Sequence, residues 1–521
     1  MSERDVEGNL SISLQRYLER RIIDDLELRE IWALRKEAAD PSRSNLLKQR
    51  FINILYEDRR LLKERLKQKL ELDEAFSNSN FIERIAEVAV ERIRCWPEAS
   101  FLRIRHKALS DAEAKRTLQG LNFGIIYGAE SILLQDTILS YQADEVCSRL
   151  GESKINILGV HRDWLTDDGR ALRGMLVDDS WRVMEVEFKE PIRLSIIQVL
   201  HLPSLGEKEI HKKISNFFES LDIPQVNPYS SSQRADDKFL THRLWSGGDG
   251  EIESPLYTLI TRGRNLKEAS ALLLSFARKI SKVRRRRRIN VFIQPNTGTE
   301  GKYVERFTID ILMKSIKGNS DIEKHLISIL RCDDVLLREE RGNVVFKRPF
   351  NPPTSFRYIS FRVNVAWDGS RFVAESGYAQ VSESQSSPVA SRGRGGEIMS
   401  LNEAFRNLYY RDRGGLSRLK PNPSLLSRIK RVIEAAAEKL NVELSPEDYL
   451  KMAGIDFLLE IKDKYVKPIL LEANPRPSGL AFSVNLRRAL NDSSQLMISH
   501  AIFNYIRSIQ KKSLRRDKMR H

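Results

Sequence analysis

Three oxygen-bearing side chains near the end of the chain have the types and the spacing to bind a divalent cation. Asp456 lies in the apolar run GIDFLLE at 454–460, and Glu472 and Asn474 lie in ILLEANPRPSG at 469–479. Residues two apart on a strand point to the same face, so Glu472 and Asn474 share one face. If the two runs pair as antiparallel neighbours, Asp456 joins them, and three hard oxygen ligands converge as Mg²⁺ requires. The spacing equally suits a surface hairpin with solvated polar residues.

Composition describes a globular chain of two or three domains. The sequence has 521 residues, of which 41% are hydrophobic and 30% charged. No apolar run approaches the roughly 20 residues of a membrane span, and the first residues lack the basic and apolar blocks of a signal peptide. The three cysteines, Cys95, Cys147 and Cys332, lack the spacing of metal ligands. We therefore expect a cytoplasmic protein with reduced thiols and no membrane contact.

The net charge of +16, from 87 basic and 71 acidic residues, raises the question of nucleic-acid binding. The basic excess is dispersed, apart from Arg284 to Arg288 and the tail KKSLRRDKMRH. Neither run has interleaved aromatic residues, zinc spacing or an RNP-type motif. We therefore do not expect specific nucleic-acid recognition, and favour a solvated basic surface or a field for anionic substrates.

The sequence pattern divides the chain into three main parts and a tail. Residues 1–118 show helical apolar spacing with little glycine, which predicts a helical accessory domain. Residues 119–230 predict an α/β subdomain with parallel strands, because strands are expected at 155–161 and 194–202 and a helix leads to a strand entry at 224–227. Residues 231–510 carry the candidate chemistry, and 511–521 form the basic tail.

The part from 231 to 510 predicts a glycine-bearing turn among strands and helices. Asp237 and Lys238 begin a predicted helix, followed by a strand at 254–260, a helix at 266–283 and a strand at 289–296. NTGTEGKYVERF at 296–307 then places Gly298 and Gly301 between two strand-like runs. Such a turn exposes backbone N–H groups that can cover a triphosphate. Two glycines are also common in hairpins that bind nothing.

Together these features resemble the ATP-grasp superfamily, of the type that joins a carboxylate to an amine. The resemblance covers residues from about 190 to 509, and its motifs are IPQVNP, the helix at Lys238, the glycine turn, VLLREERG at 335–342 and, most specifically, LLEANPRPSG. It implies α/β and α+β parts: an N-terminal helical domain, a pre-ATP-grasp α/β subdomain and an ATP-grasp domain. ATP would bind between two α+β lobes.

The resemblance also implies roles for individual residues. Asp456, Glu472 and Asn474 match ligands of Mg²⁺ or Mn²⁺, with Glu472 bridging two ions. Lys238 matches a residue that approaches the α- and β-phosphates of ATP. Further matches cover the phosphates, lie beside adenine, or touch the ribose or adenine from the hinge between the lobes. These are Gln294, Gly298, Thr299, Gly301 and Lys302 for the first group, Leu336 and Leu337 for the second, and either Glu339 or Glu340 for the third.

Four arginines match or suit anion contacts. Arg362, in RYISFRVNVAW, matches a residue that reaches the γ-phosphate or an acyl phosphate, and its planar fork suits bidentate contact with oxyanions. Arg476 follows the metal asparagine and is placed to meet a substrate carboxylate or phosphate. Arg392 and Arg394, in a basic turn ahead of a further helix, are candidates for substrate anions or ordinary surface residues.

One position departs from the family pattern. Gln294 stands where many relatives carry a lysine before proline, and glutamine can donate hydrogen bonds but brings no charge. Lys302, just past the turn, is a residue that can compensate.

The implied reaction is the ATP-dependent joining of a small-molecule carboxylate, such as an amino acid or peptide, to an amine through an acyl phosphate. The protein would mainly position the reactants and neutralise charge. A phosphotransferase on the same scaffold is the alternative, and a nucleic-acid-binding or ligand-binding protein is a third reading. The sequence does not identify the acid or the amine. Relatives are often dimers or tetramers, so a homo-oligomer remains open.

Overall fold

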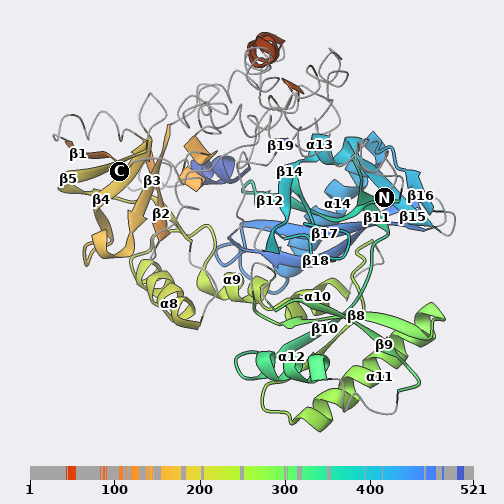
Figure 1. The fold of residues 1–521 in the computed structure, drawn as a ribbon. Helices are drawn as coiled ribbons and strands as arrows, with labels where there is room; N and C mark the ends of the chain where they lie inside the picture. The colour runs from red at the N-terminus through yellow and green to blue at the C-terminus, as the bar shows by residue number, and fades with distance from the viewer. Residues whose placement is uncertain are drawn as a thin grey trace, which may run out of the picture.

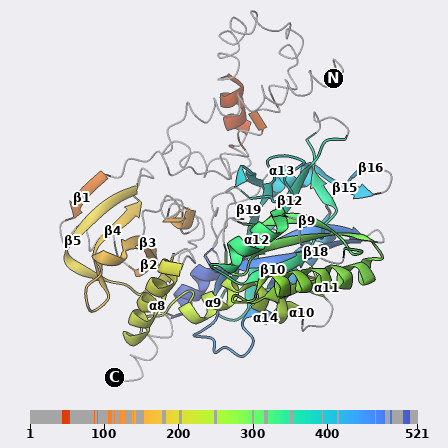
Figure 2. The same cartoon turned by 60° about the horizontal axis from the view of Figure 1, so that its bottom comes forward.

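A computed structural model describes the chain from residue 43 to residue 509 with gaps. The described ranges are 45–53, 120–127, 154–177, 183–200, 205–246, 251–298, 303–313, 320–348, 354–391, 394–412, 415–462, 465–476 and 501–509, with shorter pieces within 83–90, 105–118, 137–145 and 484–485 and at positions 43 and 301. Most of the predicted helical accessory domain, Thr299, Lys302, Arg392 and the basic tail lie outside these ranges. Figures 1 and 2 show the described parts as coloured ribbons.

The first part of the described chain is a six-stranded mixed sheet with the order β1-β5-β4-β3-β2-β6. β2 runs parallel to both β3 and β6, and α8 follows β6. The strand expected at 155–161 is β3, and the expected parallel entry after the helix is a bridge between Ile197 and Gln225. The antiparallel pair β4–β5 has no counterpart among the predicted strands, because polar residues interrupt its apolar runs. The bounds are β1 Arg105–Leu109, β2 Leu121–Tyr127, β3 Ile155–His161, η2 Arg162–Trp164, β4 Arg170–Val177, β5 Val183–Arg193, β6 Ile196–Val199 and α8 Leu205–Ser220.

A small lobe follows, drawn green in Figure 1, in which a four-stranded antiparallel sheet with the order β7-β10-β8-β9 packs on two helices. One face of the sheet is apolar and buries Val291, Ile293 and Val335 against both helices. The longer helix starts where the Asn265 side chain accepts a hydrogen bond from the backbone N–H of Glu268, at 3.0 Å. The bounds are β7 Tyr257–Ile260, α11 Leu266–Arg284, β8 Arg288–Pro295, β9 Glu305–Asp310, α12 Ser320–Leu330 and β10 Val335–Glu339.

A large lobe, drawn cyan to blue in Figure 1, is built on a nine-stranded sheet. Strand β12 lies between β13 and β17, and β17 pairs with β18 in antiparallel fashion. The basic turn at 390–398 leads into a short strand, β14, before the expected helix begins. The bounds are β11 Val344–Phe346, β12 Arg357–Trp367, β13 Phe372–Val381, β14 Glu397–Ser400, α13 Leu401–Arg406, β15 Leu408–Asp412, β16 Gly415–Arg418, α14 Pro423–Leu440, β17 Met452–Lys462, β18 Tyr465–Asn474 and β19 Val484–Asn485.

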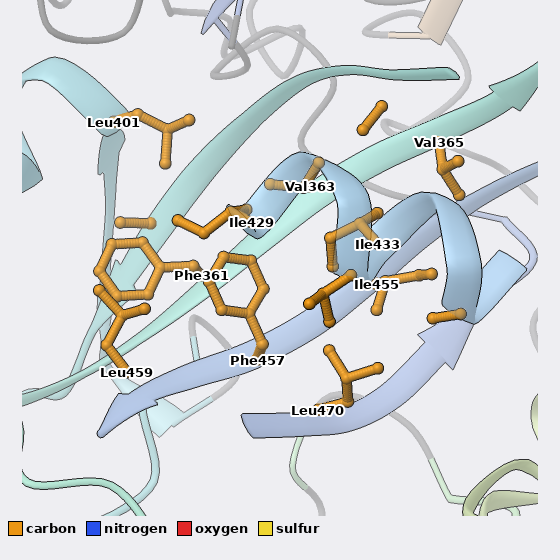
Figure 3. Close-up of a cluster of buried hydrophobic side chains, with 14 of the residues drawn as sticks. Phe361, Val363, Val365, Leu401, Ile429, Ile433, Ile455, Phe457, Leu459 and Leu470 are labelled. Carbon is orange, nitrogen blue, oxygen red and sulfur yellow. The ribbon is translucent and has the colours of Figure 1, made fainter. Parts of the chain in front are cut away.

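The core of the large lobe fixes one face of its central strands. Ile429 and Ile433 of α14 pack between Phe361, Ile455 and Leu470 of the sheet, as Figure 3 shows. All of these side chains are fully buried or nearly so. Because side chains alternate along a strand, the neighbours of these core residues must point to the opposite face of the sheet. That opposite face carries the candidate site.

Two short helices join the three parts, α9 at Tyr229–Asp236 and α10 at Lys238–Ser246. As predicted, a helix begins at Lys238; Asp237 caps it by accepting a hydrogen bond from the N–H of Leu240, at 2.8 Å. Just upstream, the Asn227 side chain bonds to the backbone of Lys451, Met452 and Pro475, at the open end of the β17–β18 pair. The segment IPQVNP is thereby attached to the strands that carry the acidic residues.

None of the helices in the described part of the chain combines the length and the apolar character that crossing a membrane requires.

Candidate active site

Strands β17 and β18 bring the three predicted metal ligands to one place. Asp456 lies directly opposite Glu472, and Asn474 lies opposite Gly454, one pair further along the same face. The amide nitrogen of Asn474 donates a hydrogen bond to Asp456 Oδ2, at 3.3 Å. The antiparallel pairing that the sequence analysis requires is therefore present.

A β-bulge in β18 sets which residues face the site. Asp456 pairs with Glu472, but the next residue, Phe457, pairs with Leu470, so Leu471 is an extra residue in β18. The bulge breaks the strict alternation of the strand. Leu470 therefore faces the hydrophobic core while Glu472, two residues later, faces the opposite side with Asp456.

Arg362 of β12 lies beside Asp456 in the same row of the sheet. Its Nε and Nη2 atoms donate to the two carboxylate oxygens of Asp456, at 2.5 and 2.6 Å. Its guanidinium also lies over the ring of Tyr378, 5.7 Å from the ring centre. In this structure Arg362 is thus engaged with a metal-ligand candidate rather than directed freely between the lobes.

Lys238 approaches the acids from α10. Its Nζ lies 3.7 Å from Glu472 Oε2 and donates to the backbone oxygen of Gly298, in the predicted glycine turn. At the other end of that turn, Gly301 has a φ of +68°, and a Cβ at this position would lie 3.2 Å from Ser391. The turn therefore reaches from Lys238 to the segment ahead of β14, and Gly301 has the close approach that favours glycine.

The charges at the site influence one another. Burial raises the pKa of Asp456 to about 6, and the neighbouring Glu472 carboxylate adds to the rise against the opposing effect of Arg362. Burial also acts to raise the pKa of Glu472, but the nearby cations, with Lys238 first, outweigh it and lower the pKa. At neutral pH both acids carry charge and lie close together, an arrangement that a cation stabilises.

The two faces of β10 separate the residues predicted to contact the nucleotide. Leu336 lies opposite Gln294 of β8, on the face turned away from α11 and α12 and toward the large lobe. Leu337 faces the other way and is part of the apolar core of the small lobe. Glu339 shares that face with Leu337, and its carboxylate accepts from Arg284 of α11, with an Nη2 to Oε2 distance of 3.0 Å. Leu337 and Glu339 are therefore not brought together with the other candidates.

The remaining predicted residues are paired across the lobes or along the chain. Glu340 accepts hydrogen bonds from Asn290, at 2.6 Å, and from Arg306, at 3.0 Å. Arg476 donates to Asp236 of α9, at 2.5 Å. Arg394 donates to Glu305 of β9, at 3.1 Å, so the basic turn contacts the small lobe.

Two further residues of the site have no place among the sequence predictions. Arg338 of β10 lies opposite Phe292, on the same face as Leu336. His242 lies one helical turn after Lys238 on α10 and stacks on Tyr257, with ring centres 4.9 Å apart. Burial lowers the pKa of His242 to about 3, so the ring is neutral at physiological pH. Two spacings in the sequence could have indicated them. Arg338 is two residues from Leu336 on a strand, and His242 is four residues from Lys238 on a helix, so each shares a face with a predicted residue.

The donor set fits Mg²⁺ in chemistry. Asp456 and Glu472 supply carboxylate oxygens and Asn474 an amide oxygen, which are the hard ligands that this ion prefers. Within the described residues no group of three or more His, Cys, Asp or Glu side chains gathers as a metal site, so the third donor here has to be the amide.

No family model matches the chain, and no curated protein matches it. Among solved structures, the chain is similar to D-cycloserine synthetase, with 12% identity, 74% of this chain and 99% of that chain covered, and a TM-score of 0.40. It is similar to D-alanyl-alanine synthetase A from Vibrio cholerae, with 11% identity, coverage of 75% and 98%, and a TM-score of 0.43. It is also similar to a RiPP-associated ATP-grasp ligase from Chryseobacterium gregarium in complex with ADP and a leader and core peptide, with 15% identity, coverage of 75% and 97%, and a TM-score of 0.37. These TM-scores are too low for the likenesses to carry any argument about this chain.

The described architecture is mixed α/β and fits the ATP-grasp fold that the sequence predicts. A small α+β lobe and a large α+β lobe face one another, and a mixed α/β sheet precedes them in the chain.

Proposed function

We propose that this protein is an ATP- and Mg²⁺-dependent ligase that joins a carboxylate to an amine through an acyl phosphate. The observation that carries the proposal is the convergence of Asp456, Glu472 and Asn474 on one face of β17 and β18, beside Lys238 and Arg362. Two adjacent carboxylates, of which Asp456 is buried and Glu472 half-buried, lie among cations and suit a reaction in which phosphate charge moves.

The proposed reaction has two steps, phosphoryl transfer to the carboxylate and then attack by the amine. An oxygen of the substrate carboxylate attacks the γ-phosphorus of ATP, the bond from that phosphorus to the bridging oxygen breaks, and ADP leaves. The amine nitrogen then attacks the carbonyl carbon, the bond to the phosphate oxygen breaks, and inorganic phosphate leaves while the nitrogen loses a proton to solvent. Neither step needs a nucleophilic side chain of the protein, whose task is to position and to neutralise.

In this proposal each group of residues has a separate task. Mg²⁺, held by Asp456, Glu472 and Asn474, would offset the charge of the phosphates. Lys238 binds the phosphate chain from α10. Arg362 turns to the transferred phosphoryl group, because a cation bound at Asp456 competes for the oxygens that Arg362 now contacts. The other proposed contacts are Gln294, Gly298, Thr299, Gly301 and Lys302 for the phosphates, Leu336 for adenine, Glu340 for the ribose and Arg476 for a substrate anion.

Glu340 is a better candidate than Glu339 for the ribose contact. Glu339 is 3% exposed and lies on the face that packs against α11, where Arg284 and the N–H of Leu256 already bind it. Glu340 binds Asn290 and Arg306, which lie on the face directed toward the large lobe. The proposed substrates are small acids and amines, including amino acids and peptides. The proposed location is the cytoplasm, which holds ATP and Mg²⁺.

A screen for ADP release tests the proposal. The purified protein is incubated with ATP, Mg²⁺ and pooled amino acids and small acids, with Glu472→Gln as the blank, and products of active pools are identified by mass spectrometry. We expect ADP release that needs both an acid and an amine. The product should have a mass equal to the sum of the masses of the acid and the amine less that of one water molecule. A stable phosphorylated product formed without amine would replace the ligase with a phosphotransferase, and no release from any pool would count against both.

A further inference from the structure

Arg338 is a buried cation that forms no hydrogen bond or ion pair with any residue that the structure describes. It lies on the central strand β10 of the small lobe and is 9% exposed. In the described part of the chain, Arg338 forms no hydrogen bond or ion pair; its only close contact of that kind is with the ring of Phe292, 5.4 Å from the guanidinium carbon. An unpaired buried charge is costly, so a position that keeps one calls for a physical reason.

Other arginines of the two lobes show the contrast. Arg341, three residues later and with a side chain only 9% exposed, binds Glu460 and Glu253. Arg362 binds Asp456, and Arg476 binds Asp236, at 2.5 Å in each case. Among the described residues, each of these guanidinium groups is thus paired with a carboxylate, and Arg338 is not.

The position of Arg338 relates it to the missing charge at Gln294. Gln294 lies opposite Leu336, so Arg338, two residues further along β10, is its diagonal neighbour on the same face. Such neighbours lie about 7–8 Å apart, within reach of a long side chain. Gln294 is itself 2% exposed, and its Nε2 has no hydrogen-bond partner among the described residues. The guanidinium group of Arg338 and the amide nitrogen of Gln294 are therefore neighbouring donors that both lack an acceptor among the described residues.

The charges around this face also require an anion. Arg338, Lys238 and Arg362 interact with the two carboxylates of Asp456 and Glu472, so positive charges exceed negative ones by one in this group. Burial lowers the pKa of Arg338, which agrees with an uncompensated cation. Bound Mg²⁺ would increase the positive excess further. A polyanion such as a phosphate chain would reverse it.

We propose that Arg338 binds phosphate oxygens of the nucleotide and supplies the positive charge that Gln294 does not bring. The inference rests on the proposed function, because it concerns the same site. Arg338 and Gln294 together form the small-lobe side of the phosphate site, with Lys238 approaching from α10.

Calorimetric titration of Arg338→Met tests this inference without any knowledge of the acid or amine. The titrants are adenosine, AMP, ADP and a non-hydrolysable ATP analogue, with Mg²⁺ present, and inorganic phosphate alone. We expect ADP and the ATP analogue to bind about 10- to 100-fold more weakly to the variant, because charge-assisted hydrogen bonds are lost. Adenosine should bind as it does to the wild type. In the series from adenosine through AMP and ADP to the ATP analogue, the first ligand whose affinity falls in the variant identifies the phosphate that Arg338 contacts.

Arg341→Met is the matched control, since it removes a neighbouring arginine with a largely buried side chain that already has carboxylate partners. We expect this control to lower the melting temperature and leave nucleotide affinity unchanged. Arg338→Met, by contrast, should melt at the same or a higher temperature without nucleotide, because it removes an unpaired buried charge.

Each other result has a definite meaning. Equal nucleotide affinity in wild type and Arg338→Met overturns the inference and leaves the proposed function intact. A loss that is as large for adenosine as for ADP, or one that affects free phosphate alone, also overturns it. A wild-type protein that binds none of the nucleotides overturns the proposed function and this inference together.

Discussion

The two lobes that face each other across the candidate site hold their charges differently. In the large lobe Arg362 lies against Asp456 with two hydrogen bonds, so cation and anion satisfy each other within one sheet. On the small-lobe side Gln294 Nε2 is buried without a hydrogen-bond partner among the described residues, and so are both ring nitrogens of His242 on the adjoining helix α10. Arg338 on the same side contacts the ring of Phe292 and forms no hydrogen bond or ion pair with a described residue. At the site itself, the large-lobe cation and anion are paired without a ligand, whereas the small-lobe side carries polar groups that lack partners among the described residues.

This difference teaches where the free energy of ligand binding would come from. Satisfied pairs lose one interaction when they gain another, so they contribute modestly to affinity. Unsatisfied buried groups have already lost their contact with water, so a ligand that pairs with them gains more. We therefore expect the large lobe to determine the chemical step and the small lobe to determine nucleotide affinity.

The strongest test of the large-lobe half of this comparison is Glu472→Gln. Replacing the carboxylate by an amide keeps the shape but removes a charge that the metal site and the phosphoryl transfer need. We expect ADP release to fall by at least about 100-fold, equivalent to about 2.7 kcal/mol in the barrier, with the circular dichroism spectrum unchanged. Glu460→Gln, on the same strand pair but bound to Arg341, should lower stability and keep turnover. Wild-type turnover in Glu472→Gln would refute the metal assignment.

A second test concerns the two faces of β10. Glu339→Gln leaves Arg284 without its carboxylate, and we expect the free energy of unfolding in urea to fall by about 2 kcal/mol while ADP affinity stays the same. Glu340→Gln is the matched neighbour on the other face, and should weaken ADP binding more than it lowers stability. If Glu339→Gln instead weakened ADP binding at unchanged stability, the division of the strand into a structural face and a ligand face would be wrong.

The smallest expected effect comes from His242. Its folded-state pKa of about 3 lies below the ordinary value of 6.5, so the unfolded chain binds the extra proton first. The stability that the neutral ring contributes is full above about pH 6.5 and is lost as the pH falls toward 3. Between pH 8 and pH 5 the wild type should therefore lose up to about 2 kcal/mol more than His242→Phe. Parallel pH profiles of unfolding free energy in the two proteins would show that the ring is not buried in neutral form.

The sequence predicts the strands of the large lobe that carry the candidate metal ligands, because their signals are local. Alternation in GIDFLLE and ILLEANPRPSG, with a short polar turn between them, is enough to predict the pairing of Asp456 with Glu472. The bulge at Leu471 is not predictable in this way, since an extra residue in a strand leaves no mark in composition. The helix start at Lys238 is predictable because aspartate caps it.

The small lobe shows where sequence reasoning stops. VLLREERG contains two adjacent acids, and a motif alone does not say which face of the strand each one takes. That depends on which alternate residues pack on α11, and the packing places Leu337 and Glu339 in the interior and Arg338 on the opposite face of the strand. The ion pair between Glu339 and Arg284 joins residues far apart in the sequence and depends on tertiary structure, so local sequence patterns do not predict it.

The extra residue at Leu471 has a consequence for how this chain can change over time. A single-codon deletion there would place Leu470 next to Glu472 and remove the bulge, so Leu470 would still face the core and Glu472 the site in a regular antiparallel pair. A deletion at another position of β18 would instead turn the residues between that position and the bulge to the opposite face. Loss of a residue should therefore be tolerated better at position 471 than at its neighbours in the strand. A deletion library scanned across 465–476 and selected for folded, active protein would test this by revealing whether position 471 is the site at which a missing residue is best tolerated.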